Sequence, residues 1–190
     1  RRAEAIGVDP AEGGDKTALA VIDANGLIEL LSLPTPNTAH IRALVLATMR
    51  RWNVEAGKVL FDAGGGGRQI ADQLREDGYG VHVAAFGSSP VLDIQYNRHT
   101  TEARRDTRED RSAYVILRDQ MYDQLRQAMD PSLGAGFGIP TTGRTHEETE
   151  ALAELRRELS LIPKTEDREG RLKMLPKNKP GLDKAGTLVG

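Results

Sequence analysis

The sequence contains no cysteine among its 190 residues. Disulfides, cysteine-ligated zinc and thiol catalysis are therefore excluded, and the absence fits a protein of the cytosol. No apolar run is long enough to span a membrane, and no secretory signal peptide is visible. The charges nearly cancel, with 26 basic and 28 acidic residues and a net charge of -2. A surface for nucleic acid would therefore have to come from local clustering of cations.

The length is typical of one domain with a substantial core. We predict that this domain occupies residues 1–176 and that residues 177–190 form a polar tail, which we expect to be flexible. The chain begins with two arginines and not with methionine, which suggests a domain that belongs to a longer polypeptide.

Short apolar runs alternate with amphipathic stretches in the first 85 residues. The pattern predicts strands at 3–9, 17–22, 27–33, 59–61 and 81–85. It predicts one helix that Asn37 or Thr38 caps and Gly57 ends, and another after the glycines 64–67. The first three strands have connections too short for parallel crossovers and must be antiparallel, whereas the last two should run parallel to the first. The predicted fold is a mixed α/β sheet of five strands flanked by helices.

The second half is less regular. Its patterns predict helices at 107–129 and 146–158, a short extended piece at 137–140, and a hairpin made by 159–162 and 171–175.

Two acidic residues, Asp9 and Asp62, each end a short apolar run. A carboxylate at the end of a buried strand is costly unless a cation or hydrogen bonds compensate it. In a sheet of the predicted order, both acids lie at the same end of neighbouring central strands. Carboxylate oxygens without a cluster of cysteine or histidine favour Mg²⁺ or Mn²⁺, and two such ions would support phosphodiester cleavage. Either acid is alternatively a helix cap or turn former.

Glycine-rich segments follow both acids. Asp15, after two glycines, is a candidate further ligand for the metal, or an ordinary turn aspartate. The run 64–67 opens a helix whose free N–H groups can bind a phosphate, or it only permits close backbone packing. The loop 13–17 superficially resembles a phosphate-binding loop, but it precedes a strand and lacks the glycine before its lysine, which excludes that motif.

Five arginines lie between 98 and 111, interleaved with four acids. Such a mixed run is usually a solvated face; the alternative is a surface that contacts the DNA backbone. The candidate DNA contacts from the whole sequence are Lys16, Arg68, Arg104, Arg105 and Arg108. The four histidines are scattered without ligand spacing.

Two motifs carry a resemblance to a known family: residues 6–17, which contain Ile-Gly-Val-Asp and Gly-Gly-Asp-Lys-Thr, and residues 61–67, which read Phe-Asp-Ala-Gly-Gly-Gly-Gly. They resemble the nuclease domain of the large terminase subunit of tailed bacteriophages, and later stretches (117–121, 136–140 and 171–177) are similar to its downstream elements. The resemblance implies a ribonuclease H-like fold with a C-terminal hairpin extension. It also implies a metal-dependent endonuclease that cuts concatemeric double-stranded DNA in the bacterial host cytoplasm.

The resemblance also implies site residues and partners. Asp9 and Asp62 match the family's first two metal-binding aspartates, and Asp15 matches an additional acid of some members. An ATPase motor domain in the same polypeptide, the portal and the small terminase subunit are the implied partners. The family's third acid lies in a late Ser-Pro-Asp-like stretch that this sequence does not contain, and Asp183 is no convincing substitute. Low nuclease activity is therefore expected of these 190 residues alone.

Two other functions compete with this one. A non-catalytic DNA-binding or docking module would keep the fold with an incomplete metal site; the missing third acid favours it and the retained aspartates oppose it. Sugar-kinase and actin-like ATPases begin with the same order of strands and helices, but they need a second similar domain for which 190 residues leave no room.

Overall fold

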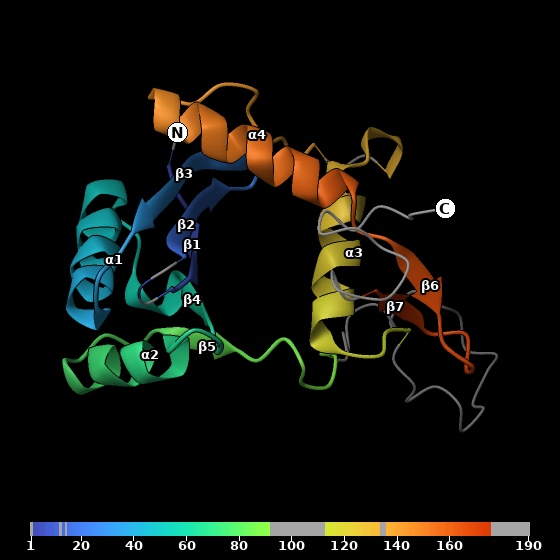
Figure 1. Ribbon diagram of the computed structural model, residues 1–190, viewed down its shortest axis with the longest axis horizontal. Helices are drawn as coiled ribbons and strands as arrows, with labels where there is room; N and C mark the ends of the chain where they lie inside the picture. Colours follow the sequence, from blue (N-terminus) through green and yellow to red (C-terminus); the bar gives the residue numbers. More distant parts are fainter. Residues whose placement is uncertain (1, 12, 14, 92–112, 134–135, 176–190) are drawn as a thin grey trace. The chain divides into compact units, whose positions relative to one another are not determined.

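The computed structural model describes residues 2–11, 13, 15–91, 113–133 and 136–175. They belong to two compact units, one of Arg1–Ala85 with Gln127–Ser160 and the other of Phe86–Arg126 with Leu161–Gly190. Figure 1 shows the chain from its N-terminal sheet to its C-terminal hairpin. The tail 177–190 lies outside the described residues, so the division into residues 1–176 and a tail stays a prediction. No helix within the described ranges is both long and apolar enough to cross a membrane.

A five-stranded mixed sheet is the centre of the first unit, as predicted. Its strands are β1 (Ala5–Asp9), β2 (Lys16–Asp23), β3 (Gly26–Pro34), β4 (Val59–Asp62) and β5 (His82–Ala84), in the spatial order β3-β2-β1-β4-β5. The pairs β1–β2 and β2–β3 are antiparallel, and β1–β4 and β4–β5 are parallel. The short loops and the intervening helices thus determine strand direction as expected.

Alternation along the strands decides which face is covered. Ile6 and Val8 of β1, Leu19 and Val21 of β2 and Phe61 of β4 are buried in one cluster. Two helices cover this face, α1 (Thr38–Trp52) through Ile41, Val45 and Met49, and α2 (Gly67–Glu76) through Ile70, Ala71 and Leu74. The residues that alternate with these point to the opposite face of the sheet. Asp9 and Asp62, the last residues of β1 and β4, are on that opposite face.

The first helix begins as predicted and ends earlier. The side chain of Asn37 accepts a hydrogen bond from the N–H of His40 (3.1 Å), which satisfies one of the unpaired donors of the first turn. The helix ends at Trp52, because Asn53 adopts a left-handed conformation (φ 52°) and donates its N–H to the carbonyls of Arg50 and Met49. The prediction that Gly57 ends this helix was wrong. A short 3-10 turn (Ala56–Lys58) contains Gly57 and leads into β4.

The helix α4 (His146–Ser160) covers the opposite face over β2 and β3, where Leu152 packs with Leu27 and Leu30. A 3-10 turn (Pro131–Leu133) and an extended piece precede α4 in the chain. The extended piece is confirmed: Gly138 bridges Gly26 at the edge of β3.

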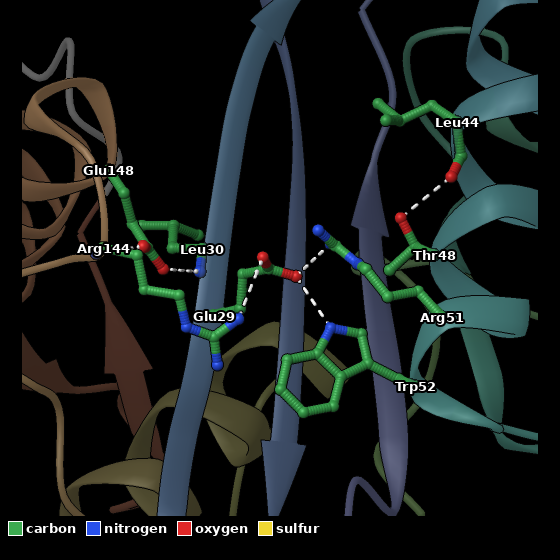
Figure 2. Close-up of polar contacts among 8 residues, drawn as sticks. All are labelled: Glu29, Leu30, Leu44, Thr48, Arg51, Trp52, Arg144 and Glu148. Carbon is green, nitrogen blue, oxygen red and sulfur yellow. Dashed lines mark hydrogen bonds and ion pairs between the residues drawn. The ribbon is translucent and has the colours of Figure 1, made fainter.

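Buried carboxylates attach these segments to the edge strand (Figure 2). Glu29 of β3 is only 4% exposed, and it accepts hydrogen bonds from Arg51 and from the indole N–H of Trp52 (2.8 Å). The guanidinium of Arg144 lies 3.6 Å from the same carboxylate and stacks over the Trp52 ring at 4.9 Å. Glu148 of α4 accepts the outward N–H of Leu30 at 3.1 Å. An edge strand leaves such donors unpaired, so these contacts both close the edge and hold α4 on the sheet.

The second unit contains most of α3 (Leu117–Met129) and a hairpin of β6 (Lys164–Glu166) and β7 (Leu172–Met174). The carboxylate of Asp119, fully buried, accepts the N–H groups of Ile116 and Met174 and so joins the helix to the hairpin. The hairpin is confirmed, but its first strand begins at Lys164 because α4 continues to Ser160. The predicted helix at 107–129 begins only at Leu117 in the part the structure describes, and its residues 107–112 lie outside that part.

Candidate metal site and DNA-contact surface

Asp9 and Asp62 lie at the C-terminal ends of the two central parallel strands. Val8 of β1 is paired with Phe61 of β4, so Asp9 and Asp62 are the next residues along each strand. Neighbouring strands are about 4.8 Å apart, and residues in one row point to the same face. The two carboxylates therefore extend from adjacent positions on the face opposite the α1–α2 core. Asp9 is exposed and Asp62 is partly exposed.

Small side chains flank the two acids in the same row. Asp9 is paired with Ala18 of β2, and Asp62 is paired with Ala84 of β5. Ala18 is in turn paired with Ser32 of β3. Methyl and hydroxymethyl groups at these positions crowd the two carboxylates less than large side chains would. The apolar contacts of α4 involve Ala20 and Ile22, which lie further from this end of the sheet.

The glycine run after Asp62 packs against the residue after Asp9. A Cβ at Gly65, which has a φ of +56°, would overlap the carbonyl oxygen of Pro10. At Gly67 a Cβ would overlap the carbonyl oxygen of Asp62 and lie 2.9 Å from Cγ of Pro10. Asp62 Oδ1 also accepts the N–H of Gly64 at 3.2 Å. Gly65 and Gly67 thus allow the loop after Asp62 to pack against the loop after Asp9. This contact supports the interpretation that the glycines 64–67 permit close backbone packing.

Two threonine hydroxyls hold the loop after Asp9 from its other side. Thr17 (0% exposed) and Thr35 (5% exposed) have their Oγ1 atoms 2.5 Å apart. The N–H of Ala11 donates to Thr17 Oγ1 (3.0 Å), and Thr35 Oγ1 donates to the carbonyl of Ala11 (2.7 Å). The sequence analysis missed this pair. Its signal is a polar residue in an otherwise apolar alternation, since Thr17 shares a face with Leu19 and Val21.

Asp15 occupies an exposed bend just before β2. Within the described residues, no three or more histidine, cysteine, aspartate or glutamate side chains gather in a group that could hold a metal ion. The structure therefore brings Asp9 and Asp62 to adjacent positions and adds no third acid to them in the part it describes. The role of Asp15 as a metal ligand stays a prediction.

Two of the predicted DNA contacts lie near the acids. Lys16 begins β2 two residues before Ala18, so its side chain starts on the same face as the carboxylates, and it is exposed. Arg68 is exposed in the first turn of α2, just after the glycine run. Neither cation has an ion pair with another described residue. Arg104, Arg105 and Arg108 lie outside the described residues.

The order and directions of the strands define a ribonuclease H-like fold. Solved structures of the same arrangement are nuclease domains of phage large terminase subunits. A mutant nuclease domain of the large terminase subunit gp2 of bacterial virus Sf6, solved with manganese and β-thujaplicinol, has a TM-score of 0.63 and 17% identity and covers 98% of this chain and 84% of that chain. The Sf6 domain without mutation (TM-score 0.60, 17% identity) and a mutant with calcium (TM-score 0.60, 17% identity) have the same coverage.

No protein-family model matches the sequence, and no curated protein does. At 17% identity, the likeness to the Sf6 domain concerns the fold alone.

Proposed function

We propose that this chain is the metal-dependent endonuclease domain of a viral DNA-packaging terminase and that it cuts double-stranded concatemeric DNA. The observation that carries the proposal is the placement of Asp9 and Asp62 at adjacent positions of the central parallel strand pair. Both acids face away from the apolar core and are accessible. The nuclease domains that share this fold, one of them solved with manganese, support the same reaction class.

The residues present fit a hard divalent cation. Asp9 and Asp62 offer carboxylate oxygens from one row, and the alanines beside them leave room for the ion and its water. We propose Mg²⁺ or Mn²⁺, in a site for two ions. When bound, such ions would stabilise negative charge on the phosphodiester and supply an activated water. Within the described ranges the site has two clear acids, so remaining ligands would be water, Asp15 or an acid beyond these ranges.

The chain's other residues would orient the DNA. Lys16 and Arg68 would neutralise phosphates on either side of the scissile bond. The α2 helix begins after Gly66 without a side-chain cap; the N–H of Gly67 donates to the carbonyl of Gly64 (2.8 Å), and the N–H groups that follow it in the first turn would be available to a phosphate. These groups contact the DNA backbone and carry no base-specific information. We therefore propose cleavage with little sequence preference.

The proposed reaction belongs to DNA packaging in the bacterial host cytoplasm. We propose that an ATPase motor domain in the same polypeptide moves the DNA, and that the portal and the small terminase subunit are partners of the assembly. The large-terminase identity of the structural neighbours supports this setting.

A second candidate is a DNA-binding or docking module without catalysis. The observation that favours it is the absence of a third clustered acid within the described residues.

Cleavage of supercoiled plasmid, measured with Mn²⁺, with Mg²⁺ and with EDTA, tests the endonuclease. Nicking that requires the cation and disappears in the Asp9→Asn, Asp62→Asn double variant would support it. Cation-independent duplex binding without any nicking, in the chain and in a longer polypeptide that contains it, would support the docking module instead.

A further inference from the structure

The peptide of Ala11 is part of a closed ring of hydrogen bonds. Its N–H donates to Thr17 Oγ1 at 3.0 Å, and its carbonyl accepts from Thr35 Oγ1 at 2.7 Å. Each hydroxyl has one proton, and the two oxygens are 2.5 Å apart. Both hydroxyls lie within hydrogen-bond distance of the Ala11 carbonyl, Thr35 at 2.7 Å and Thr17 at 3.1 Å, so one of them donates to the carbonyl and the other donates to its neighbouring hydroxyl. Every donor in the ring then has an acceptor, and a chain of this kind strengthens each of its bonds.

The ring connects residues at the ends of three strands that pair with one another in the sheet, β1 with β2 and β2 with β3. Thr17 is the second residue of β2, Thr35 follows β3, and Ala11 lies two residues after the end of β1. Thr35 also accepts the N–H of Gly13 on its carbonyl at 3.3 Å. Both hydroxyls are on buried side chains, so removing one hydroxyl leaves the other without its buried partner.

The Pro10–Ala11 dipeptide lies between the hydroxyl ring and the glycine loop that follows Asp62. Pro10, buried between Asp9 and Ala11, packs against Gly65 and Gly67 of the loop that follows Asp62. Asp9 is one peptide away from Pro10, and the Asp62 carboxylate accepts the N–H of Gly64 in the glycine loop. The pairing of β1 with β4 places the two acids in adjacent positions, and this stack of hydroxyl ring, Pro10–Ala11 dipeptide and glycine loop holds together the loops that follow them.

We propose that Thr17 and Thr35 are positioning residues of the metal site. This inference rests on the proposed function. Through the Ala11 peptide, their hydroxyls set where the Asp9 carboxylate stands relative to Asp62, and they thereby raise the affinity of the pair for a divalent cation. Groups that orient a ligand without touching the metal typically change metal affinity about 10- to 100-fold when they are removed.

The test measures Mn²⁺ affinity by electron paramagnetic resonance of the free ion, with no nuclease activity required. Thr17→Val and Thr35→Val remove a hydroxyl with little change of shape, and we expect each to weaken Mn²⁺ binding about tenfold. Thr17→Ser keeps the hydroxyl and should bind Mn²⁺ nearly as the parent does. Thr48→Val is the matched control, because Thr48 is a buried threonine of α1 whose hydroxyl donates to the carbonyl of Leu44, away from the acids.

Folding of each variant is followed by thermal unfolding. If valine at position 17 prevents folding, Thr17→Ala makes the same comparison. Parental Mn²⁺ affinity in folded variants without a hydroxyl at position 17 or 35, or an equal loss in Thr48→Val, would overturn the positioning role alone. A parent that binds Mn²⁺ no better than the Asp9→Asn, Asp62→Asn double variant would overturn the proposed function, and this inference with it.

Discussion

The carbonyl oxygen of Pro10 lies against the α-carbon of Gly65, where any side chain would overlap it. This contact joins the loop after Asp9 to the loop after Asp62. The φ of +56° at Gly65 adds a second requirement for glycine, because a left-handed conformation is unfavourable for residues with a Cβ.

Gly65→Ala should therefore destabilise the protein. The conformational term is about 1–2 kcal/mol, and the overlap with Pro10 adds about 1–3 kcal/mol. Thermal unfolding should show the loss, whereas Gly80→Ala, where a Cβ would meet nothing within 4 Å, should unfold near the parental temperature. Equal melting temperatures for both variants would contradict the close approach.

In a longer polypeptide that contains this chain and the missing acid, Asp9→Asn and Asp62→Asn should each lower Mn²⁺-dependent plasmid cleavage by at least about a hundredfold, since a direct ligand should matter more than the groups that orient it. The amide keeps the size of the side chain and removes its charge, so circular dichroism should remain that of the parent. Asp72→Asn is the matched control, because Asp72 is an exposed acid of α2 that pairs with Arg75. The role of Asp62 would be wrong if its variant cut plasmid at the parental rate.

Duplex DNA binding should weaken steeply as salt rises. Each phosphate that a cation neutralises contributes about -0.9 to the slope of log affinity against log salt. We expect Lys16→Ala and Arg68→Ala each to lower the magnitude of that slope by about 0.9. Lys58→Ala should leave it unchanged, because Lys58 precedes β4 and lies at the strand end opposite Asp62. Tight binding that salt does not affect would exclude recognition through phosphates.

Glu29→Gln should destabilise the protein by about 1–2 kcal/mol, because the half-exposed Arg51 and Arg144 would lose the carboxylate they share while the amide oxygen can still accept a hydrogen bond (Figure 2). Trp52, the one tryptophan of the sequence, donates to the same carboxylate, so its fluorescence should shift in the variant. Glu154→Gln is the control, since Glu154 is an exposed acid of α4. An unchanged stability in Glu29→Gln would mean that this cluster does not hold α1 and α4 on the edge strand.

The hairpin of the second unit should lose stability in acid. The backbone N–H of Arg171 holds the pKa of the Asp167 carboxyl below its usual value, and hydrogen bonds from the Arg171 side chain and the Glu169 N–H act in the same direction. Because the pKa of Asp167 is lower in the folded state, its charged form stabilises the turn at any pH above the ordinary aspartate pKa of about 3.9. This stabilisation is lost as the pH falls through the pKa of the folded state.

Nuclear magnetic resonance of the Asp167 carboxyl measures that titration directly. In Asp167→Asn the pH dependence of the turn should be absent. A carboxyl that titrates at or above the ordinary aspartate value would show that the turn does not use its charge.

Local patterns determined the elements of the sheet. Alternating burial along β2 and the apolar spacing of Ile41, Val45 and Met49 in α1 depend on residues close in the sequence. The short loops between the first three strands required antiparallel neighbours, and the helical crossovers required parallel ones; the structure has these strand directions. Asp9 and Asp62 could be selected in the same way, because each ends its own strand.

Tertiary structure decided what depends on distant partners. The predicted end of α1 at Gly57 was wrong, because Asn53 adopts the left-handed conformation that ends the helix and no glycine is required there. The burial of Glu29 follows from Arg144 and Trp52, far from it in sequence, and the hydroxyl ring of Thr17 and Thr35 exists only where β2 and β3 bring their ends to Ala11. Hydrogen bonds form only at short distance and suitable angle, and the ion pairs of Glu29 need partners that the fold brings close, so a sequence pattern that reports burial and period does not specify them.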